Sequence, residues 1–245
     1  MNAYKSKIVI ICGATSGIGR EMALYFVRQG YRVGAMGRRR DLLESFKNES
    51  PDTISIMDVD INHEDATERF IALVKEMGGM DIYIHVSGIG FKNLDYDVAK
   101  EMAMVETNSM GFARMVSCAY RYFVDQKSGH LAVVSSVAGT MGLGAAPAYS
   151  STKRFQNHYI QCLQQHSKIR NLNITFSDIR PGFVDTDLLK GSHYPMLMGK
   201  EKVARIASQA VMKKKRVKVI DWRWAIVVFF WRLIPNPLWE HLRIK

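Results

Sequence analysis

Cysteine is scarce in this 245-residue sequence, and the three that occur stand far apart. Cys12, Cys118 and Cys162 are odd in number and lack CxxC spacing, which argues against a disulfide framework or a zinc site and fits a reducing compartment. The apolar run before Gly13 is only five residues long, too short for a signal peptide or a membrane span. We therefore expect a cytoplasmic protein without a bound metal.

The sequence also lacks Pro/Ser-rich linkers, low-complexity stretches and internal repeats that would divide it. Its 47% hydrophobic content is enough to bury the core of one large α/β domain. We predict one domain at 1–220, followed by an apolar, Trp-rich C-terminal extension at 221–245.

Acidic residues are too few to balance the basic ones, and the formal net charge is +11. Two basic clusters stand out, GRRR at 37–40 and KKKRVK at 213–218. Neither is accompanied by stacking aromatic residues or by a recognisable reading element, so we expect no nucleic-acid partner. Diffuse positive charge of this kind is most often a solvated surface.

Short apolar runs alternate along the chain with longer segments of helical periodicity. The Ile- and Val-rich runs carry few charges, as expected for strands covered on both faces. The segments 92–127 and 147–168 are each long enough for a long helix. The pattern predicts a Rossmann-type α/β fold, a doubly wound parallel seven-stranded sheet with helices on both faces. The expected strands are 7–12, 31–37, 53–59, 81–88, 130–136, 173–179 and 216–220.

A glycine-rich loop, CGATSGIGR, follows the first predicted strand directly. Gly13, Gly17 and Gly19 allow a tight turn and close backbone approach to a pyrophosphate, whose charge would lie at the following helix N-terminus. The spacing is G-x-x-x-G-x-G. Glycines often mark turns, but this position between strand and helix favours a nucleotide site.

Several spaced motifs resemble the short-chain dehydrogenase/reductase superfamily, in its single-domain branch, over about residues 5–220. GATSGIG is similar to the family's TGxxxGIG loop, VSGIG at 86–90 stands where the family has NNAG, and RPGFVDT at 180–186 matches the loop after the sixth strand. The family's Asn-Ser-Tyr-Lys tetrad is matched by Asn108, Ser136, Tyr149 and Lys153.

Tyr149 and Lys153 stand four residues apart, so on a helix they address the same site. A nearby ammonium favours the phenolate, and we expect it to lower the tyrosine pKa toward neutrality, which suits a general acid/base. The resemblance implies that Ser136 binds the substrate oxygen, Lys153 the nicotinamide ribose and Asn108 a water for proton return. Taken singly, these residues also suit ordinary strand-end and surface positions; their register with the glycine loop favours catalysis.

The residues after the second strand bear on the choice of cofactor. An NAD enzyme places an acid there, whereas this chain has Gly37 followed by Arg38, whose guanidinium suits a 2′-phosphate. We therefore expect NADPH rather than NADH. Arg39 assists or, like Arg40, is a solvated residue of the next helix. The resemblance implies a cofactor site formed by Gly13, Thr15, Ser16, Gly17, Ile18, Gly19, Arg38, Arg39, Asp58, Val59, Ser87, Gly88, Tyr149, Lys153, Pro181, Gly182, Val184 and Thr186.

All four tryptophans lie in the last 24 residues. The charge-free run between Arg223 and Arg232 is eight residues long and cannot span a bilayer. Apolar residues at helical spacing with flanking cations suit a peripheral helix at a membrane surface, and the basic cluster would attract anionic lipid through 213–245. The alternative is that the segment packs on its own domain or across a dimer interface.

These features predict an NADPH-dependent carbonyl reductase of a hydrophobic ketone or aldehyde, such as a keto-lipid or ketosteroid-like molecule. The Met-rich segment 193–200 lies where the family covers its substrate. The alternatives are an NAD-linked alcohol dehydrogenase and a non-catalytic NADP(H)-binding sensor. The resemblance also implies a homodimer or homotetramer that pairs through 92–127 and 147–168.

Overall fold

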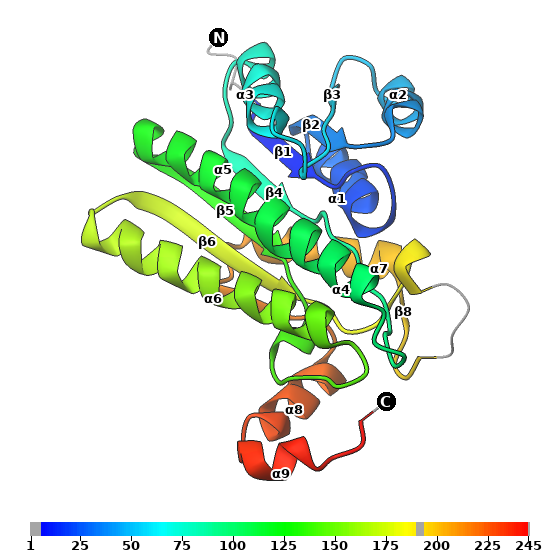
Figure 1. Cartoon of the computed structure of the whole chain (residues 1–245). Coiled ribbons are helices and arrows are strands. Elements are labelled where there is room, and N and C mark those ends of the chain that lie inside the picture. Colours follow the sequence, from blue (N-terminus) through cyan, green and yellow to red (C-terminus); the bar gives the residue numbers. More distant parts are fainter. Residues whose placement is uncertain (1–5, 190–193, 245) are drawn as a thin grey trace.

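The computed structural model of the chain describes residues 6–189 and 194–244, and it has the predicted α/β architecture (Figure 1). Its 7-stranded sheet has the order β3-β2-β1-β4-β5-β6-β9, and every neighbouring pair is parallel. All five side chains of β1 are buried, as expected for a strand covered on both faces. The strands are β1 (Ile8–Cys12), β2 (Arg32–Gly37), β3 (Ile54–Asp58), β4 (Ile82–His85), β5 (Ser128–Val134), β6 (Asn173–Arg180) and β9 (Val217–Val219).

Helices cover both faces of the sheet, each over its own apolar core. Alternate strand residues such as Ile8 and Ile10 pack with α3, α5 and α6, whereas Val9 and Ile11 pack with α1, α2 and α7. Because the helices lie over the two faces and all strands run in the same direction, the carboxyl ends of the strands lie together along one edge of the sheet. The helices are α1 (Gly17–Arg28), α2 (Arg40–Asn48), α3 (Ala66–Met77), α4 (Val98–Val105), α5 (Phe112–Gln126), α6 (Pro147–Ile169) and α7 (Lys200–Met212).

The helix predicted at 92–127 is shorter and interrupted. It begins at Val98, because the Asp97 side chain accepts hydrogen bonds from the backbone N–H groups of residues 99 and 100. A π-helical segment, Glu106–Gly111, then separates α4 from α5. The prediction for 92–97 was wrong because apolar spacing alone does not reveal where a cap starts the helix.

The predicted fourth strand, 81–88, also ends early. The N–H groups of Val86 and Ser87 both donate to the Cys12 carbonyl, at 2.8 and 3.0 Å, so the chain leaves the ladder after His85. The other strand boundaries differ from the predictions by one or two residues at either end, as helix and strand ends commonly do.

The chain after β6 contains elements that the pattern did not predict. Two short strands, β7 (Val184–Asp185) and β8 (Met198–Gly199), pair in parallel, and the C-terminal segment folds into α8 (Trp222–Trp231) and α9 (Asn236–Glu240). Both helices lie beyond one end of the sheet, near the start of α6 (Figure 1). Residues 190–193, which include the start of the Met-rich segment, lie outside the described residues. Among the described residues, no helix is long and apolar enough to cross a bilayer.

Candidate active site

The predicted site residues gather at the carboxyl ends of the strands. Residues 13–19 follow β1, Arg38 and Arg39 follow β2, and Asp58 and Val59 end or follow β3. Ser87 and Gly88 follow β4, and residues 181–186 follow β6. This edge is where open parallel sheets bind their ligands.

The glycine loop turns tightly between β1 and α1. Gly13 adopts φ +95, and a Cβ there would lie 2.6 Å from the backbone nitrogen of Ser87, so only glycine fits without strain. The helix then begins at Gly17, and its first turn, GIGR, has no acidic residue. Its uncapped N–H groups and positive dipole end are suited to a pyrophosphate.

The edge beyond β2 is positively charged. A Cβ at Gly37 would lie 2.6 Å from Cγ2 of Thr15, so the position of the expected acid admits no side chain without a shift. The guanidinium of Arg39 donates to the hydroxyls of Thr15 and Ser16, at 3.0 and 2.6 Å, and so lies over the glycine loop. Arg38 is exposed at the same edge. Two guanidinium groups therefore lie at the edge where an acidic side chain is absent.

Asp58 lies where the resemblance places the adenine. Its carboxylate accepts from Arg69 at 2.7 Å and lies 3.5 Å from Arg40. A cavity of about 230 Å³ adjoins it, lined by Arg40, Ile56, Met57 and Asp58. The neighbouring Val59 is buried and donates its N–H to the Gly37 carbonyl at 2.9 Å. This bond joins the end of β3 to the end of β2.

Two of the predicted tetrad residues, Asn108 in the π-helical segment and Lys153 on α6, meet over the loop after β4. A Cβ at Gly88 would lie 3.0 Å from Oδ1 of Asn108 and 3.5 Å from Nζ of Lys153, so these two side chains meet over the end of β4. Oδ1 of Asn108 accepts from Ile89 N–H at 2.9 Å, and its Nδ2 donates to the Ile89 carbonyl at 2.7 Å. Asn108 is thus a fully buried brace between helix and loop, not a surface amide.

Gln156 belongs to the same cluster and was missed in the sequence. Its Oε1 accepts from Nζ of Lys153 at 3.1 Å, and its Nε2 donates to the backbone carbonyl of Asn108 at 2.9 Å. That carbonyl lies in the π-helical segment, where the regular i→i+4 ladder is interrupted. The only signal in the sequence is its position three residues after Lys153, on the same helix face.

Tyr149 and Ser136 face one another across the site. Ser136 begins a short 3₁₀ turn, and its Oγ accepts from Ala138 N–H at 3.1 Å. Burial raises the pKa of Tyr149 above its usual value, and a hydrogen bond with Ser136 lowers it in part. The predicted lowering by Lys153 is not seen, because Nζ lies 5.7 Å from the ring centre and is hydrogen-bonded to Gln156.

Lys153 is itself perturbed. Burial lowers its pKa to about 8, while the negative charge of Asp178 acts in the opposite direction. A tyrosine held protonated beside a lysine that titrates near neutrality can give a proton to a substrate oxygen and be replenished.

The loop after β6 closes over the glycine loop. The Pro181 carbonyl accepts from Val137 N–H at 3.0 Å, next to Ser136. At the other end of the loop, Cγ2 of Thr186 lies 3.4 Å from the Cβ position of Gly17. Val184, buried in β7, anchors the part between.

The C-terminal helices reach this loop, which the sequence did not reveal. A Cβ at Gly182 would overlap the indole of Trp224, so the loop and α8 are in direct contact. Trp224 packs with Val137 and Val228, and Phe183 joins the same cluster. The tail therefore forms part of the wall behind Ser136.

Two buried groups near the site are structural. Burial raises the pKa of the Cys12 thiol to about 12 and lowers that of His85 to about 3. His85 Nδ1 lies 3.1 Å from the Tyr83 hydroxyl, while its Nε2 has no hydrogen-bond partner among the described residues. Across residues 6–189 and 194–244 there is no group of three or more side chains that could hold a metal ion.

Comparisons with known proteins agree with this geometry. A family model described as short chain dehydrogenase matches residues 7–195. An uncharacterized oxidoreductase of Myxococcus xanthus (strain DK1622) is 31% identical over 244 residues, which is 96% of this chain and 95% of the relative. An uncharacterized oxidoreductase of Staphylococcus aureus (strain MW2) is 28% identical over 190 residues, covering 76% of this chain and 81% of the relative.

Solved structures share the fold. A 3-ketoacyl-(acyl-carrier-protein) reductase from Brucella melitensis complexed with NADH superposes with a TM-score of 0.79 at 21% identity, over 88% of this chain and 96% of that one. A serine dehydrogenase complexed with NADP+ gives a TM-score of 0.71 at 25% identity, over 81% and 86%. The protein called ElxO, with NADP bound, gives 0.79 at 21% identity, over 90% and 99%.

Proposed function

The chain belongs to the short-chain dehydrogenase family, and from this premise we propose that it reduces a hydrophobic ketone or aldehyde with NADPH. Membership makes it an NAD(P)-dependent oxidoreductase. The observation that carries the proposal is the pairing of Ser136 with Tyr149, a phenol that holds its proton at neutral pH and whose pKa burial raises further. A protonated phenol beside a hydroxyl is what a carbonyl oxygen needs as it gains negative charge.

The residues divide the work as follows. NADPH, when bound, supplies the hydride to the carbonyl carbon. Ser136 holds the substrate oxygen, and Tyr149 donates its proton to that oxygen as the alcohol forms. Lys153 would hold the nicotinamide ribose, and Asn108 and Gln156 fix the orientation of its ammonium. In the reverse direction Tyr149 would accept the proton.

NADPH is favoured over NADH by the residues beyond β2. Gly37 has no room for an acid, and Arg38 and Arg39 present two guanidinium groups at that edge. An acid would repel a 2′-phosphate, whereas a guanidinium binds it with paired hydrogen bonds. Because the solved neighbours carry either NADP or NADH, their cofactors do not decide the choice, and the proposal of NADPH rests on these residues of the chain itself.

A hydrophobic substrate is favoured by the surroundings of Tyr149. A Cβ at Gly90 would lie 2.8 Å from the Tyr149 ring and 3.4 Å from Leu188, so Leu188 borders the reacting phenol. Leu188 is 40% exposed, and Phe91 and Leu94 on the preceding loop are 44% and 65% exposed. Exposed apolar groups around a reaction centre suit a ligand that covers them.

Consumption of NADPH tests the proposal, using keto-lipids, ketosteroids, 3-oxoacyl thioesters and small aldehydes as substrates. We expect turnover with one class, weaker with NADH, and reduced about 10²–10⁴-fold in Tyr149→Phe because a general acid is lost. Tyr159→Phe is the matched control, since Tyr159 lies on the same helix and contacts Ser117 at 2.7 Å instead.

The same assay separates the alternatives. Oxidation of an alcohol with NAD, faster than any NADPH-linked reduction, would assign the NAD-linked alcohol dehydrogenase instead. Tight NADPH binding without turnover of any class, in the presence and absence of lipid vesicles, would assign the non-catalytic sensor. Either outcome would overturn the reductase.

We also propose that two copies pair through α4, the π-helical segment and α6. Met102 and Met110 are 60% and 59% exposed, and Phe155 on α6 is 38% exposed. A monomer gains nothing by exposing these side chains together, whereas a homodimer or homotetramer buries them. Light scattering after size exclusion checks this: a mass of one chain at micromolar concentration would contradict it.

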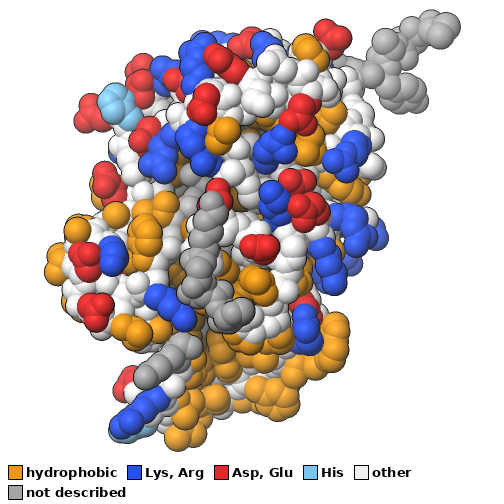
Figure 2. Space-filling model, turned by 90° about the vertical axis from the view of Figure 1, so that its right-hand side faces the viewer, with side chains coloured by type: hydrophobic (Ala, Val, Ile, Leu, Met, Phe, Trp, Pro, Cys, Tyr) orange, Lys and Arg blue, Asp and Glu red, His pale blue; other side chains and the backbone are white. Residues whose placement is uncertain are grey.

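A membrane surface is the second proposed partner. Hydrophobic side chains gather at the lower end of the molecule in Figure 2, where Figure 1 places α8 and α9. Among them, Trp222, Phe229, Phe230, Leu233 and Leu238 are between 58% and 72% exposed. Clustered aromatic residues with flanking cations suit the interface of an anionic bilayer. Flotation of the full chain with anionic vesicles tests this, and failure to float would overturn it.

A further inference from the structure

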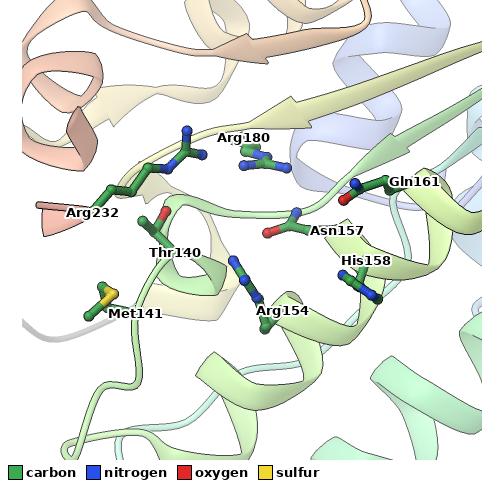
Figure 3. Close-up of a pocket in the computed structure, with 8 residues that line it drawn as sticks. All are labelled: Thr140, Met141, Arg154, Asn157, His158, Gln161, Arg180 and Arg232. Atoms are coloured by element: carbon green, nitrogen blue, oxygen red, sulfur yellow. The ribbon is translucent and has the colours of Figure 1, made fainter. Parts of the chain in front are cut away.

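A second pocket lies away from the predicted cofactor and substrate sites. It has a volume of about 390 Å³, within the range typical of small-molecule sites, and opens between α6, the turn after β5, the end of β6 and the end of α8 (Figure 3). Arg154 and Asn157 face it from α6, and Arg180 and Arg232 from the other elements.

This pocket occupies a different face of α6 from the redox site. At 3.6 residues per turn, Tyr149, Lys153 and Gln156 share one stripe of the helix. Arg154 and Asn157 share another, and the mean directions of the two sets lie about 100° apart around the axis. The pocket is therefore separate from the groups proposed for hydride and proton transfer.

Positive charge dominates the pocket. Three guanidinium groups line it, and none of its lining residues is an acid. In the described part of the chain, neither Arg154 nor Arg232 forms an ion pair, while Arg180 is held from behind by Asp178 at 2.6 Å. Burial, and then the charges of Arg180 and Arg154, lower the pKa of Arg232. Arg154 and Arg232 thus line the pocket with Arg180 without an acidic partner of their own among the described residues.

Two buried polar atoms in the pocket lack partners as well. Thr140 and Asn157 are 6% and 5% exposed, yet Oγ1 of Thr140 and Oδ1 of Asn157 make no hydrogen bond in the described part of the molecule. Buried polar atoms in native proteins are normally hydrogen-bonded, so each points to a missing partner. The threonine hydroxyl can donate to an anion, and the asparagine oxygen can accept from an O–H group.

We propose that this pocket binds a phosphate group, carried either by a soluble phosphomonoester or by a lipid headgroup. A phosphate has enough oxygens to accept from three guanidinium groups and the Thr140 hydroxyl together, whereas a carboxylate has two. A phosphate O–H, or a neighbouring hydroxyl of the ester, would donate to Oδ1 of Asn157. Arg232 lies at the end of α8, so a lipid-borne phosphate would reach the pocket beside the exposed apolar side chains of that helix.

The first measurement is calorimetric titration of the full-length protein with inorganic phosphate. NADP+ is present at saturation, so that the cofactor's own phosphate positions are occupied, and chloride keeps the ionic strength constant. We expect saturable binding that acetate does not reproduce. Arg154→Gln and Arg232→Gln should each weaken it about tenfold, the effect of losing one charged hydrogen bond.

The matched control is Arg205→Gln, an exposed arginine on α7, which should change the affinity less than about twofold. A wild-type experiment covers the case in which a pocket variant fails to fold. Phosphate should protect Arg154 and Arg232, but not Arg205, from modification by phenylglyoxal, as read by peptide mass spectrometry. Equal affinities in all four proteins, or protection that does not distinguish the arginines, would overturn the proposal.

A vesicle arm distinguishes the two sources of phosphate. Vesicles of phosphatidylcholine with phosphatidic acid are compared with phosphatidylcholine alone, using the same variants. Extra binding to phosphatidic acid that is lost in Arg154→Gln and Arg232→Gln but kept in Arg205→Gln assigns a lipid headgroup. Arginine-dependent binding of inorganic phosphate without that difference assigns a soluble phosphomonoester. Independence from Arg154 and Arg232 in both arms overturns the site.

Discussion

Two regions depart from the rule that apolar side chains are buried and polar side chains exposed. One is the polar cluster of Asn108, Lys153 and Gln156, where polar side chains are buried; the other is the pair of C-terminal helices, α8 and α9, where apolar side chains are exposed. In the cluster, Asn108 and Gln156 are completely buried and Lys153 is 5% exposed. At the C-terminus, Trp222 and Phe230 are 72% and 58% exposed. Polar groups inside and large apolar groups outside both oppose folding stability. Such reversals in one chain mark the places where function shapes the structure.

The two regions differ in how they are held. In the cluster, each buried polar group is tied to another: Lys153 to Gln156, Gln156 to Asn108, and Asn108 to the loop after β4. Among the described residues, the tail is attached by a few buried side chains and by one hydrogen bond, from the Trp239 indole to the Gly142 carbonyl at 2.6 Å. We therefore expect the loss of one member to disturb the whole cluster. In the tail, by contrast, the buried anchoring side chains and the exposed apolar side chains can be substituted separately.

The largest effect is expected at an anchor of the tail. Trp224→Ala should lower the free energy of unfolding by about 3–5 kcal/mol, because it empties a buried site against Gly182 and Val137. Urea denaturation of the full chain measures it. Trp222→Ala, in the same helix but exposed, should change it by no more than about 0.5 kcal/mol. Equal losses would show that α8 is not divided into an anchor and a free face.

A pH effect should follow from Lys153. Its folded pKa of about 8 lies below the usual value of 10.5, so the folded state binds fewer protons and stability rises with pH between these values. From pH 8 to 10, wild type should gain about 2 kcal/mol relative to Lys153→Met. Above pH 10 the raised pKa of Tyr149 acts with the opposite sign. Urea denaturation at both pH values checks this, and parallel changes in the two proteins would contradict it.

Gln156→Met should have a smaller effect on stability, about 1–2 kcal/mol, because it removes the hydrogen bond to the Asn108 carbonyl and the acceptor of the Lys153 ammonium. It should also lower the pKa of Lys153, since Oε1 accepts from the charged form. The alkaline limb of the kcat profile should therefore move to lower pH. Gln165→Met, on the exposed face of α6, is the control, and an unmoved limb would reduce Gln156 to a packing role.

The smallest effect on stability is expected on the exposed face of the tail. Phe229→Ser with Phe230→Ser should change the free energy of unfolding by no more than about 0.5 kcal/mol, because both rings are more than half exposed. Flotation with anionic vesicles should nevertheless be lost. Ile169→Ser, which removes a side chain that is 74% exposed on α6, should leave flotation intact. Unchanged flotation in the double variant would assign the apolar face to protein contacts.

Local patterns predicted much of this structure. The seven strands follow from their apolar runs and the glycine loop from its place after the first strand, while Ser136, Tyr149 and Lys153 were identified by their resemblance to the family's tetrad. Contacts between distant segments could not be predicted in this way. The π-helical segment has the same helical periodicity as its neighbours, so nothing local shows that it aims Asn108 at the loop after β4.

The tail shows the same limit. Its tryptophans indicated a surface helix, but which of them would be buried depends on a loop about 40 residues earlier in the chain. The pKa of Tyr149 is a further case. One turn of helix brings Lys153 onto the same face, yet burial of the phenol and the lysine's bond to Gln156 decide the direction of the shift.

The contact between Gly182 and Trp224 has a consequence for protein engineering and for inheritance. Any larger residue at position 182 would displace the indole, and a smaller residue in place of Trp224 would leave a gap beside the loop. The loop and the tail therefore form one exchangeable module, although about 40 residues separate them in the chain. A chimera that takes the C-terminal helices from a relative should also take that relative's residues 181–186, and recombination that parts the two should be selected against.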